Sequence, residues 1–211
     1  MLYSEINSWN YFKRKNQLLK IRIVILIMMV LSVFAKAEHH RILPMSVAAV
    51  QYAGSIGWLT MGYFRQSTNK KIELGLLYGY TPEALGGEIH SIALKFIYEP
   101  YRMAIKNSFQ IEPIQTGLFV TQNFTKNLYL GWPDKYDPGY YWWTCSTRFH
   151  VFLGNQVSWM IQSKTVEKVS LYFEANTNDL YLFSYLGNKN YKSLSVDDII
   201  FFGIGSKIYF Q

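Results

Sequence analysis

Three residues of the kinds that together catalyse acyl transfer lie in two short stretches of the sequence: His150, Ser170 and Glu174. A carboxylate that orients a histidine, which in turn activates a serine hydroxyl, is a common arrangement for nucleophilic attack on an ester. Apolar and polar residues alternate in residues 148–154 and 168–176, so all three side chains are predicted to share one face of two adjacent strands. The sequence therefore offers them as a candidate catalytic set.

A second group consists of ionisable side chains that stand singly on the polar faces of the expected strands. Charges of both signs can pair inside a small barrel whose interior is otherwise nearly filled by side chains. The favoured interpretation is a plug of ion pairs. A path for protons or small solutes is the alternative, and it needs a wider lumen than eight strands enclose. The predicted interior polar cluster contains Glu73, Lys95, Glu99, Arg148, His150, Glu174 and Lys207.

A third group is an aromatic stretch in one of the longest connections between expected strands. Tyrosine and tryptophan favour the membrane–water interface, where one side of the ring is apolar and the other is wet. An interfacial girdle with a self-packed loop is the favoured interpretation, and a surface that binds an extracellular ligand is the alternative. The residues concerned are Trp132, Tyr136, Tyr140, Tyr141, Trp142 and Trp143.

Composition argues against several other kinds of site. The single cysteine, Cys145, cannot form an intramolecular disulfide, and no set of cysteines and histidines has metal-ligand spacing. We therefore expect no metal and no cofactor. The net charge of +7 comes from 21 basic and 14 acidic residues, but six of the basic residues and one acid lie in residues 1–37. The remainder carries about +2, so nucleic acid is not an expected partner.

The first 37 residues have the features of a secretory signal peptide. A basic stretch that includes Lys13, Arg14 and Lys20 precedes an apolar run over residues 23–34, and Ala35-Lys36-Ala37 fits a cleavage site. An uncleaved membrane anchor is the alternative, but a spanning helix needs about 20 apolar residues. We therefore expect a signal peptide over residues 1–37 and one domain over residues 38–211.

The stretch IIFFGIGSKIYFQ, residues 199–211, has the clearest strand pattern. Phe202, Ile204 and Ile208 share one face with Ser206 and Phe210, while the other face mixes glycines with polar groups. Such alternation is typical of a strand with lipid on one side and a polar interior on the other. Similar alternation predicts strands in residues 71–80, 91–99, 148–154 and 168–176, and more weakly in residues 45–53, 56–65 and 111–121.

Loop lengths agree with a barrel of eight strands. The connections after the third, fifth and seventh expected strands are long, and those after the second, fourth and sixth are shorter. Outer-membrane barrels have long extracellular loops and short periplasmic turns. The short connection around Gly54 does not fit, which places the position of the first strand in question.

These observations predict an all-β fold: an eight-stranded antiparallel transmembrane β-barrel of the outer-membrane type, located in the outer membrane of a bacterial cell. Outer-membrane lipid (lipopolysaccharide) is the expected partner, while the oligomeric state stays open. A structural or surface-binding role without catalysis is expected. One alternative is a membrane-embedded, lipid-modifying hydrolase. A second is a soluble periplasmic β-barrel that binds an apolar ligand and turns its large apolar faces inward.

Two resemblances accompany this interpretation. The strings GLLYGYTPEALGG, WPDKYDPGYYWW and FEANTNDLYLFSY resemble segments of uncharacterised outer-membrane barrels of the Bacteroidetes type, which implies a Gram-negative source, the fold and the location. In size and architecture the chain distantly resembles the outer-membrane lipid A deacylases. That family has a His-x-Ser pair on one strand and a glutamate on the next. Here Phe152 stands two positions after His150, and the neighbours His90 and Ser91 are predicted to point to opposite faces.

Overall fold

The computed structural model describes residues 45–85, 87–106, 108–125, 146–161, 163–188 and 193–211. The chain divides into two units, residues 1–42 and 43–211, and the description below concerns the second. The signal peptide expected over residues 1–37 lies outside the described residues, as do Cys145 and the aromatic residues between 129 and 143.

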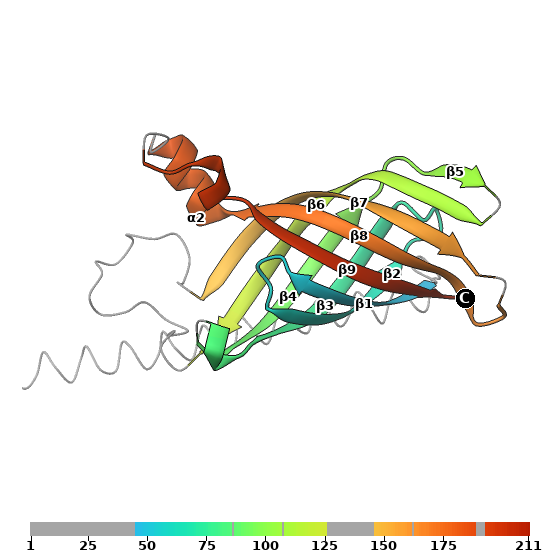
Figure 1. Ribbon diagram of the computed structural model, residues 1–211, viewed down its shortest axis with the longest axis horizontal. Coiled ribbons are helices and arrows are strands. Elements are labelled where there is room, and N and C mark those ends of the chain that lie inside the picture. Colours follow the sequence, from blue (N-terminus) through green and yellow to red (C-terminus); the bar gives the residue numbers. More distant parts are fainter. Residues whose placement is uncertain (1–44, 86, 107, 126–145, 162, 189–192) are drawn as a thin grey trace, which may run out of the picture. The chain divides into compact units, whose positions relative to one another are not determined.

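Nine strands occur in the described residues, and each pairs with its neighbours in the antiparallel sense. Pairing of β1 with β9 and of β4 with β6 closes eight of them into a barrel, while β5 pairs with the start of β6 (Figure 1). The predicted eight-stranded antiparallel barrel is therefore confirmed. The strands are β1 (Met45–Ala53), β2 (Leu59–Gln66), β3 (Ile72–Thr81), β4 (Ile89–Tyr98), β5 (Met103–Lys106), β6 (Phe109–Phe124), β7 (Thr147–Met160), β8 (Val166–Asn178) and β9 (Phe201–Phe210).

Short helices occupy the connections at one end of the barrel. A 3₁₀ turn, η1 (Glu83–Leu85), lies between β3 and β4. Between β8 and β9 lie α2 (Asp179–Leu182), η2 (Phe183–Gly187) and η3 (Val196–Asp198). Within the described ranges, no helix is long and apolar enough to cross a membrane.

The connections alternate between the two ends of the barrel as the loop lengths predict. Those after β1, β3, β6 and β8 share one end, which we call the loop end. The turns after β2 and β7 and the β4–β6 connection share the other end with Met45 and Gln211, and we call it the terminal end. Figure 1 shows α2 and the C-terminus at opposite ends.

The short connection between β1 and β2 is genuine, and the first strand lies where the sequence predicts it. Ala53, Gly54 and Ser55 adopt positive φ values of 59°, 82° and 70°, which turn the chain sharply. The loop then packs into the barrel, because the Ile56 side chain is buried and the Asn176 amide donates to the carbonyl oxygen of Gly54 over 3.1 Å. This short connection therefore packs into the loop end of the barrel.

The outward face of the barrel is apolar and the inward face is largely polar. Large apolar side chains such as Leu76, Leu153 and Ile204 are about half exposed, at 47%, 60% and 55%. Glu73 and Lys207 point inward and are 0% and 1% exposed. A soluble barrel for an apolar ligand would have the opposite arrangement, so that alternative is not supported.

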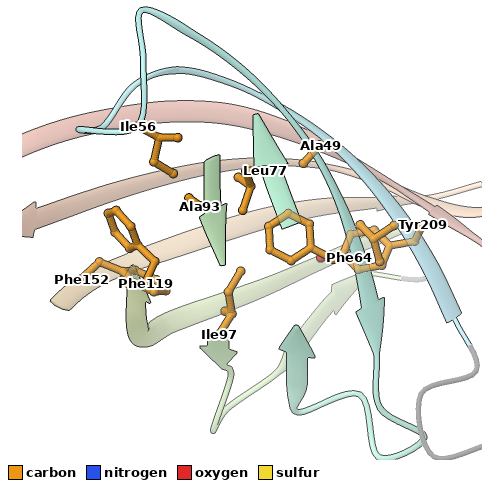
Figure 2. Close-up of a cluster of buried hydrophobic side chains, with 10 residues drawn as sticks. Ala49, Ile56, Phe64, Leu77, Ala93, Ile97, Phe119, Phe152 and Tyr209 are labelled. Atoms are coloured by element: carbon orange, nitrogen blue, oxygen red, sulfur yellow. The ribbon is translucent and has the colours of Figure 1, made fainter. Parts of the chain in front are cut away.

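Apolar side chains nevertheless fill part of the interior (Figure 2). Phe64 packs over Gly75 on the neighbouring strand, where any Cβ atom would overlap its ring. Glycines on the inward face thus provide the room that the large interior rings need. The buried cluster contains Val47, Ala49, Ile56, Phe64, Leu77, Ala93, Ile97, Phe119, Phe152 and Tyr209.

A bulge interrupts the alternation in β6. The pairing with β7 shifts between Glu112 and Gln115, and both residues are buried while Pro113 and Ile114 between them are exposed. Proline has no N–H to donate to the sheet, so it is tolerated at such a bulge. The strand predicted over residues 111–121 continues through this bulge and runs from Phe109 to Phe124.

Candidate functional site: the barrel interior

A buried ion pair joins β3 to β9 across the lumen. Lys207 Nζ lies 2.7 Å from Glu73 Oε2, and both side chains are at most 1% exposed. The Glu73 carboxylate also accepts hydrogen bonds from the Tyr209 hydroxyl at 2.7 Å and from Gln66 Nε2 at 2.9 Å. Such additional hydrogen bonds are what make a buried pair tolerable, because they replace the lost hydration of the charges.

A second pair, Lys95 with Glu174, joins β4 to β8. Gln51 Nε2 donates to Glu174 Oε1 over 3.0 Å, and Gln51 Oε1 accepts from the Tyr172 hydroxyl over 2.8 Å. The Lys95 ammonium also lies 4.5 Å from the centre of the Phe152 ring. This ammonium group is therefore held by a carboxylate and by an aromatic face.

A third group of charges surrounds Glu112 near the terminal end. Its carboxylate contacts Lys168 Nζ at 2.8 Å, the Ser158 hydroxyl at 3.0 Å and Arg102 Nε at 3.3 Å. Arg102 also reaches Glu99 Oε2 at 3.0 Å. One arginine thus bridges two buried carboxylates.

The predicted cluster omits three members of this group: Arg102, Glu112 and Lys168. Arg102 lies in a connection without period-2 alternation, and the bulge at Pro113 hides the inward orientation of Glu112. The alternation does place Lys168 on the polar face of its strand, but the predicted cluster does not include it. Pro113 is the feature of the sequence that indicates a bulge in this strand, where the alternation of inward and outward residues shifts by one position.

Neutral polar side chains connect two of the charged groups. Gln156 Nε2 donates to the Tyr209 hydroxyl at 3.1 Å and to the Ser158 hydroxyl at 3.3 Å. Gln115 Nε2 donates to Glu99 and, over 3.1 Å, to Gln156 Oε1. A continuous hydrogen-bonded network therefore runs from the Glu73 pair to the Glu112 group.

Two residues of the predicted cluster lie apart from these ion pairs. The His150 ring stacks on Phe119 with 4.3 Å between ring centres, and its Nε2 lies 3.2 Å from the Thr121 hydroxyl. Arg148 is half-buried and donates to the carbonyl oxygen of Thr147 over 3.2 Å. The other five, Glu73, Lys95, Glu99, Glu174 and Lys207, are buried and paired as described above.

The three catalytic candidates share the inward face but do not meet. His150 is paired with Asn178, whereas Glu174 stands opposite Gly154 and Ser170 opposite Ser158. At about 3.3 Å per residue, Glu174 and Ser170 lie roughly 13 and 26 Å along the strand from the position opposite His150. The Ser170 hydroxyl instead lies 2.8 Å from that of Ser158, and Glu174 is bound to Lys95. The structure therefore shows no relay from carboxylate to imidazole to serine among them.

The aromatic set Trp132, Tyr136, Tyr140, Tyr141, Trp142 and Trp143 lies outside the described residues. In the part of the chain that is described, no group of three or more His, Cys, Asp or Glu side chains has a geometry that could hold a metal ion.

Comparison with solved structures finds similar chains, whereas comparison with family models and curated proteins finds none. The N-terminal β-barrel domain of Pseudomonas aeruginosa OprF is similar with a TM-score of 0.39 and 11% identity, over 79% of this chain and 96% of that one. The fold is an eight-stranded antiparallel barrel of the outer-membrane type. The closed strand pairing, the apolar outward face and the polar interior define this fold.

Proposed function

We propose that this protein is a barrel of the bacterial outer membrane with a structural or surface-binding role and no catalytic one. One observation carries the proposal: an apolar outward wall encloses an interior occupied by paired charges and aromatic rings. Lipid is the solvent that suits such a wall, and an interior of this kind suits a rigid membrane anchor.

The interior favours a plug rather than a channel. Paired charges occupy the lumen at three places, which are Lys207 with Glu73, Lys95 with Glu174, and Lys168 with Glu112. The β1–β2 loop packs into the loop end through Ile56. Eight strands leave room for little more than these side chains.

Aromatic pairs on the outward face support a position across a bilayer. At the loop end, the rings of Tyr52 and Trp58 meet edge to face with 5.8 Å between centres. At the terminal end, Phe109 and Trp159 do the same at 5.0 Å. Girdles of aromatic residues at both interfaces are typical of outer-membrane barrels. Outer-membrane lipid, lipopolysaccharide included, is thus the proposed partner of the outward wall.

Several finer expectations remain proposals. The connection that holds Trp132 and Tyr136 is proposed to bind an extracellular ligand, on the strength of its composition. The Bacteroidetes-type origin and the resemblance to lipid A deacylases stay predictions from sequence. No contact among His150, Ser170 and Glu174 supports the hydrolase alternative.

Fractionation combined with heat-modifiability tests the proposal. The full chain is expressed in a Gram-negative host, outer membranes are isolated, and boiled and unboiled samples are compared on detergent gels. We expect recovery in the outer membrane and a mobility shift on boiling, because a closed barrel resists unfolding by detergent until it is heated. Recovery as a soluble periplasmic protein without a shift would refute the proposal.

A further inference from the structure

An arginine and two hydroxyl groups lie together on the outward face of the barrel at the terminal end. The residues are Ser46 on β1 and Tyr63 and Arg65 on β2, and we call them the terminal cluster. Arg65 pairs with Ser46 across the two strands and lies one residue before β2 ends at Gln66. Gln66 and Phe64 point inward and are 0% and 1% exposed, so Tyr63 and Arg65 point outward. The terminal cluster therefore lies where the apolar wall ends.

Hydrogen bonds join the three members of the terminal cluster. Arg65 Nη1 donates to the Ser46 hydroxyl over 3.1 Å and to the Tyr63 hydroxyl over 3.3 Å. The two hydroxyl oxygens lie 2.8 Å apart. All three residues belong to paired strands, so the barrel wall fixes their positions. Both hydroxyls are neutral, and these contacts therefore orient the guanidinium group without neutralising its positive charge.

The groups present suit a phosphate. A guanidinium group has five N–H donors in a planar fork that matches phosphate oxygens, and hydroxyl groups can donate to the same oxygens. A cationic ligand would be repelled by Arg65. The turns at this end add further positive charge, because Lys71 and Lys164 are exposed. The terminal end therefore attracts anions.

The position of the terminal cluster identifies the source of that phosphate. Next to Tyr63 on the outward face lie Met61 and Leu76, which are 60% and 47% exposed and can pack against acyl chains. An arginine on a lipid-facing wall is costly at the bilayer midplane but not at the interface, where its charged group reaches the headgroups. The short turns of an outer-membrane barrel face the periplasm, so the terminal end meets the phospholipids of the periplasmic leaflet.

We propose that the terminal cluster binds the phosphate of a phospholipid headgroup through the Arg65 guanidinium group and the hydroxyls of Ser46 and Tyr63, while the acyl chains cover the apolar wall. The proposal rests on the proposed function, since it requires the barrel to be inserted in a bilayer with its terminal end toward the periplasm.

The test compares lipid retention by the full chain and by single variants. Each protein is reconstituted into bilayers of phosphatidylglycerol and digalactosyldiacylglycerol in equal amounts, and the lipids that remain bound after mild detergent extraction are counted by native mass spectrometry. Phosphatidylglycerol carries a phosphate and the galactolipid does not. Arg65→Gln and Tyr63→Phe are the site variants. Lys164→Gln, which removes an exposed positive charge from the β7–β8 turn at the same end, is the matched control.

We expect the ratio of retained phosphatidylglycerol to galactolipid to fall about two- to five-fold in each site variant, as for the loss of one exposed ion pair or of one hydrogen bond to a charged group. The ratio should be unchanged in Lys164→Gln. Inorganic phosphate, compared with chloride at the same ionic strength, should leave the wild-type ratio unchanged, because the acyl chains hold the lipid. An unchanged ratio in Arg65→Gln, an equal fall in the control, or displacement of the lipid by inorganic phosphate would overturn the proposal.

Heat-modifiability of each reconstituted protein separates this inference from the proposed function. A mobility shift in the wild type and the variants, together with unchanged ratios, would refute the phosphate site alone. Absence of the shift in the wild type would refute both. If Arg65→Gln shows no shift and has therefore not folded, the ratio in Tyr63→Phe decides.

Discussion

Removal of the Lys207 charge is the most direct test of the interior. Replacing Lys207 with methionine keeps the length and apolar stem of the side chain but leaves the Glu73 carboxylate buried without its cation. Breaking a buried pair by removing one partner typically costs 3–5 kcal/mol. Glu73 retains hydrogen bonds from Tyr209 and Gln66. Each of these bonds still stabilises the buried carboxylate, because a hydrogen bond to a charged acceptor contributes more free energy than one to a neutral acceptor. We therefore expect a loss at the lower end, about 3 kcal/mol of unfolding free energy.

The double variant Lys207→Met with Glu73→Gln sharpens the prediction. The glutamine can still accept from Tyr209, and no charge is left unpaired, so the double variant should be more stable than the sum of the two single losses implies. We expect a coupling free energy of about 2 kcal/mol, which lies within the range for residues in direct contact. Lys70→Met is the matched control, since Lys70 pairs with Glu167 at the terminal end with 39% of its side chain exposed. An exposed pair contributes about 0–1 kcal/mol.

The assay is reversible unfolding by urea of the protein folded in lipid vesicles. Tryptophan fluorescence follows the transition, and the fraction that migrates as the folded form on unboiled gels checks it. A loss of unfolding free energy in Lys207→Met no larger than in Lys70→Met would refute the importance of the buried charge. Losses in Lys207→Met and Glu73→Gln that simply add up to the loss in the double variant would also refute it, because the two charges would then not interact.

Three further predictions test the outward face, a close strand contact and a helix cap. Leu153→Arg places a charge on the lipid-facing wall and should cost about 2–4 kcal/mol in vesicles if it lies near the bilayer midplane, whereas Leu85→Arg in a connection should change the urea midpoint little. Gly117→Ala should destabilise the barrel by a few kcal/mol in the same assay, because its Cβ would overlap a carbonyl oxygen of the neighbouring strand. Hydrogen bonds from the Ser195 backbone and side chain lower the pKa of Asp198. The Asp198 carboxylate therefore stabilises the helix cap at a pH above its unfolded pKa, and this stabilisation is lost as the pH falls through the folded pKa. Ser195→Ala removes the side-chain hydrogen bond and should raise the pKa of Asp198 in an NMR titration.

Strand positions could be predicted from sequence wherever one face is apolar and the other is not. In β9, Phe202 and Ile204 alternate with two glycines, and the alternation reports the face of each residue directly. The pattern fades where outward positions become polar, as at Asn155 in β7, so the prediction ended at Gly154 while the strand continues to Met160.

The candidate site was harder to predict, because alternation gives the face of a residue but not its register. His150 and Ser170 do share the inward face, yet strand pairing sets them far apart along the barrel. Register depends on turns and bulges, and a shift of one residue moves a side chain by about 3.3 Å. Arg102 had no strand pattern at all, although it bridges Glu99 and Glu112. The sequence therefore predicts that charged residues pair inside the barrel, but it does not predict which residue pairs with which.

The interior ion pairs also affect the order in which the barrel closes and inserts into the membrane. Lys95 and Lys207 reach carboxylates that are 79 and 134 positions away along the chain. Contacts so distant in sequence require long loops to close first, which slows folding. Before β9 docks against β1, Glu73 lacks Lys207, and an unpaired carboxylate is costly to bring into lipid. Insertion and closure should therefore occur as a single kinetic step, seen as one phase shared by protease protection and the mobility shift. The buried charges would then prevent partly folded barrels from inserting into the membrane.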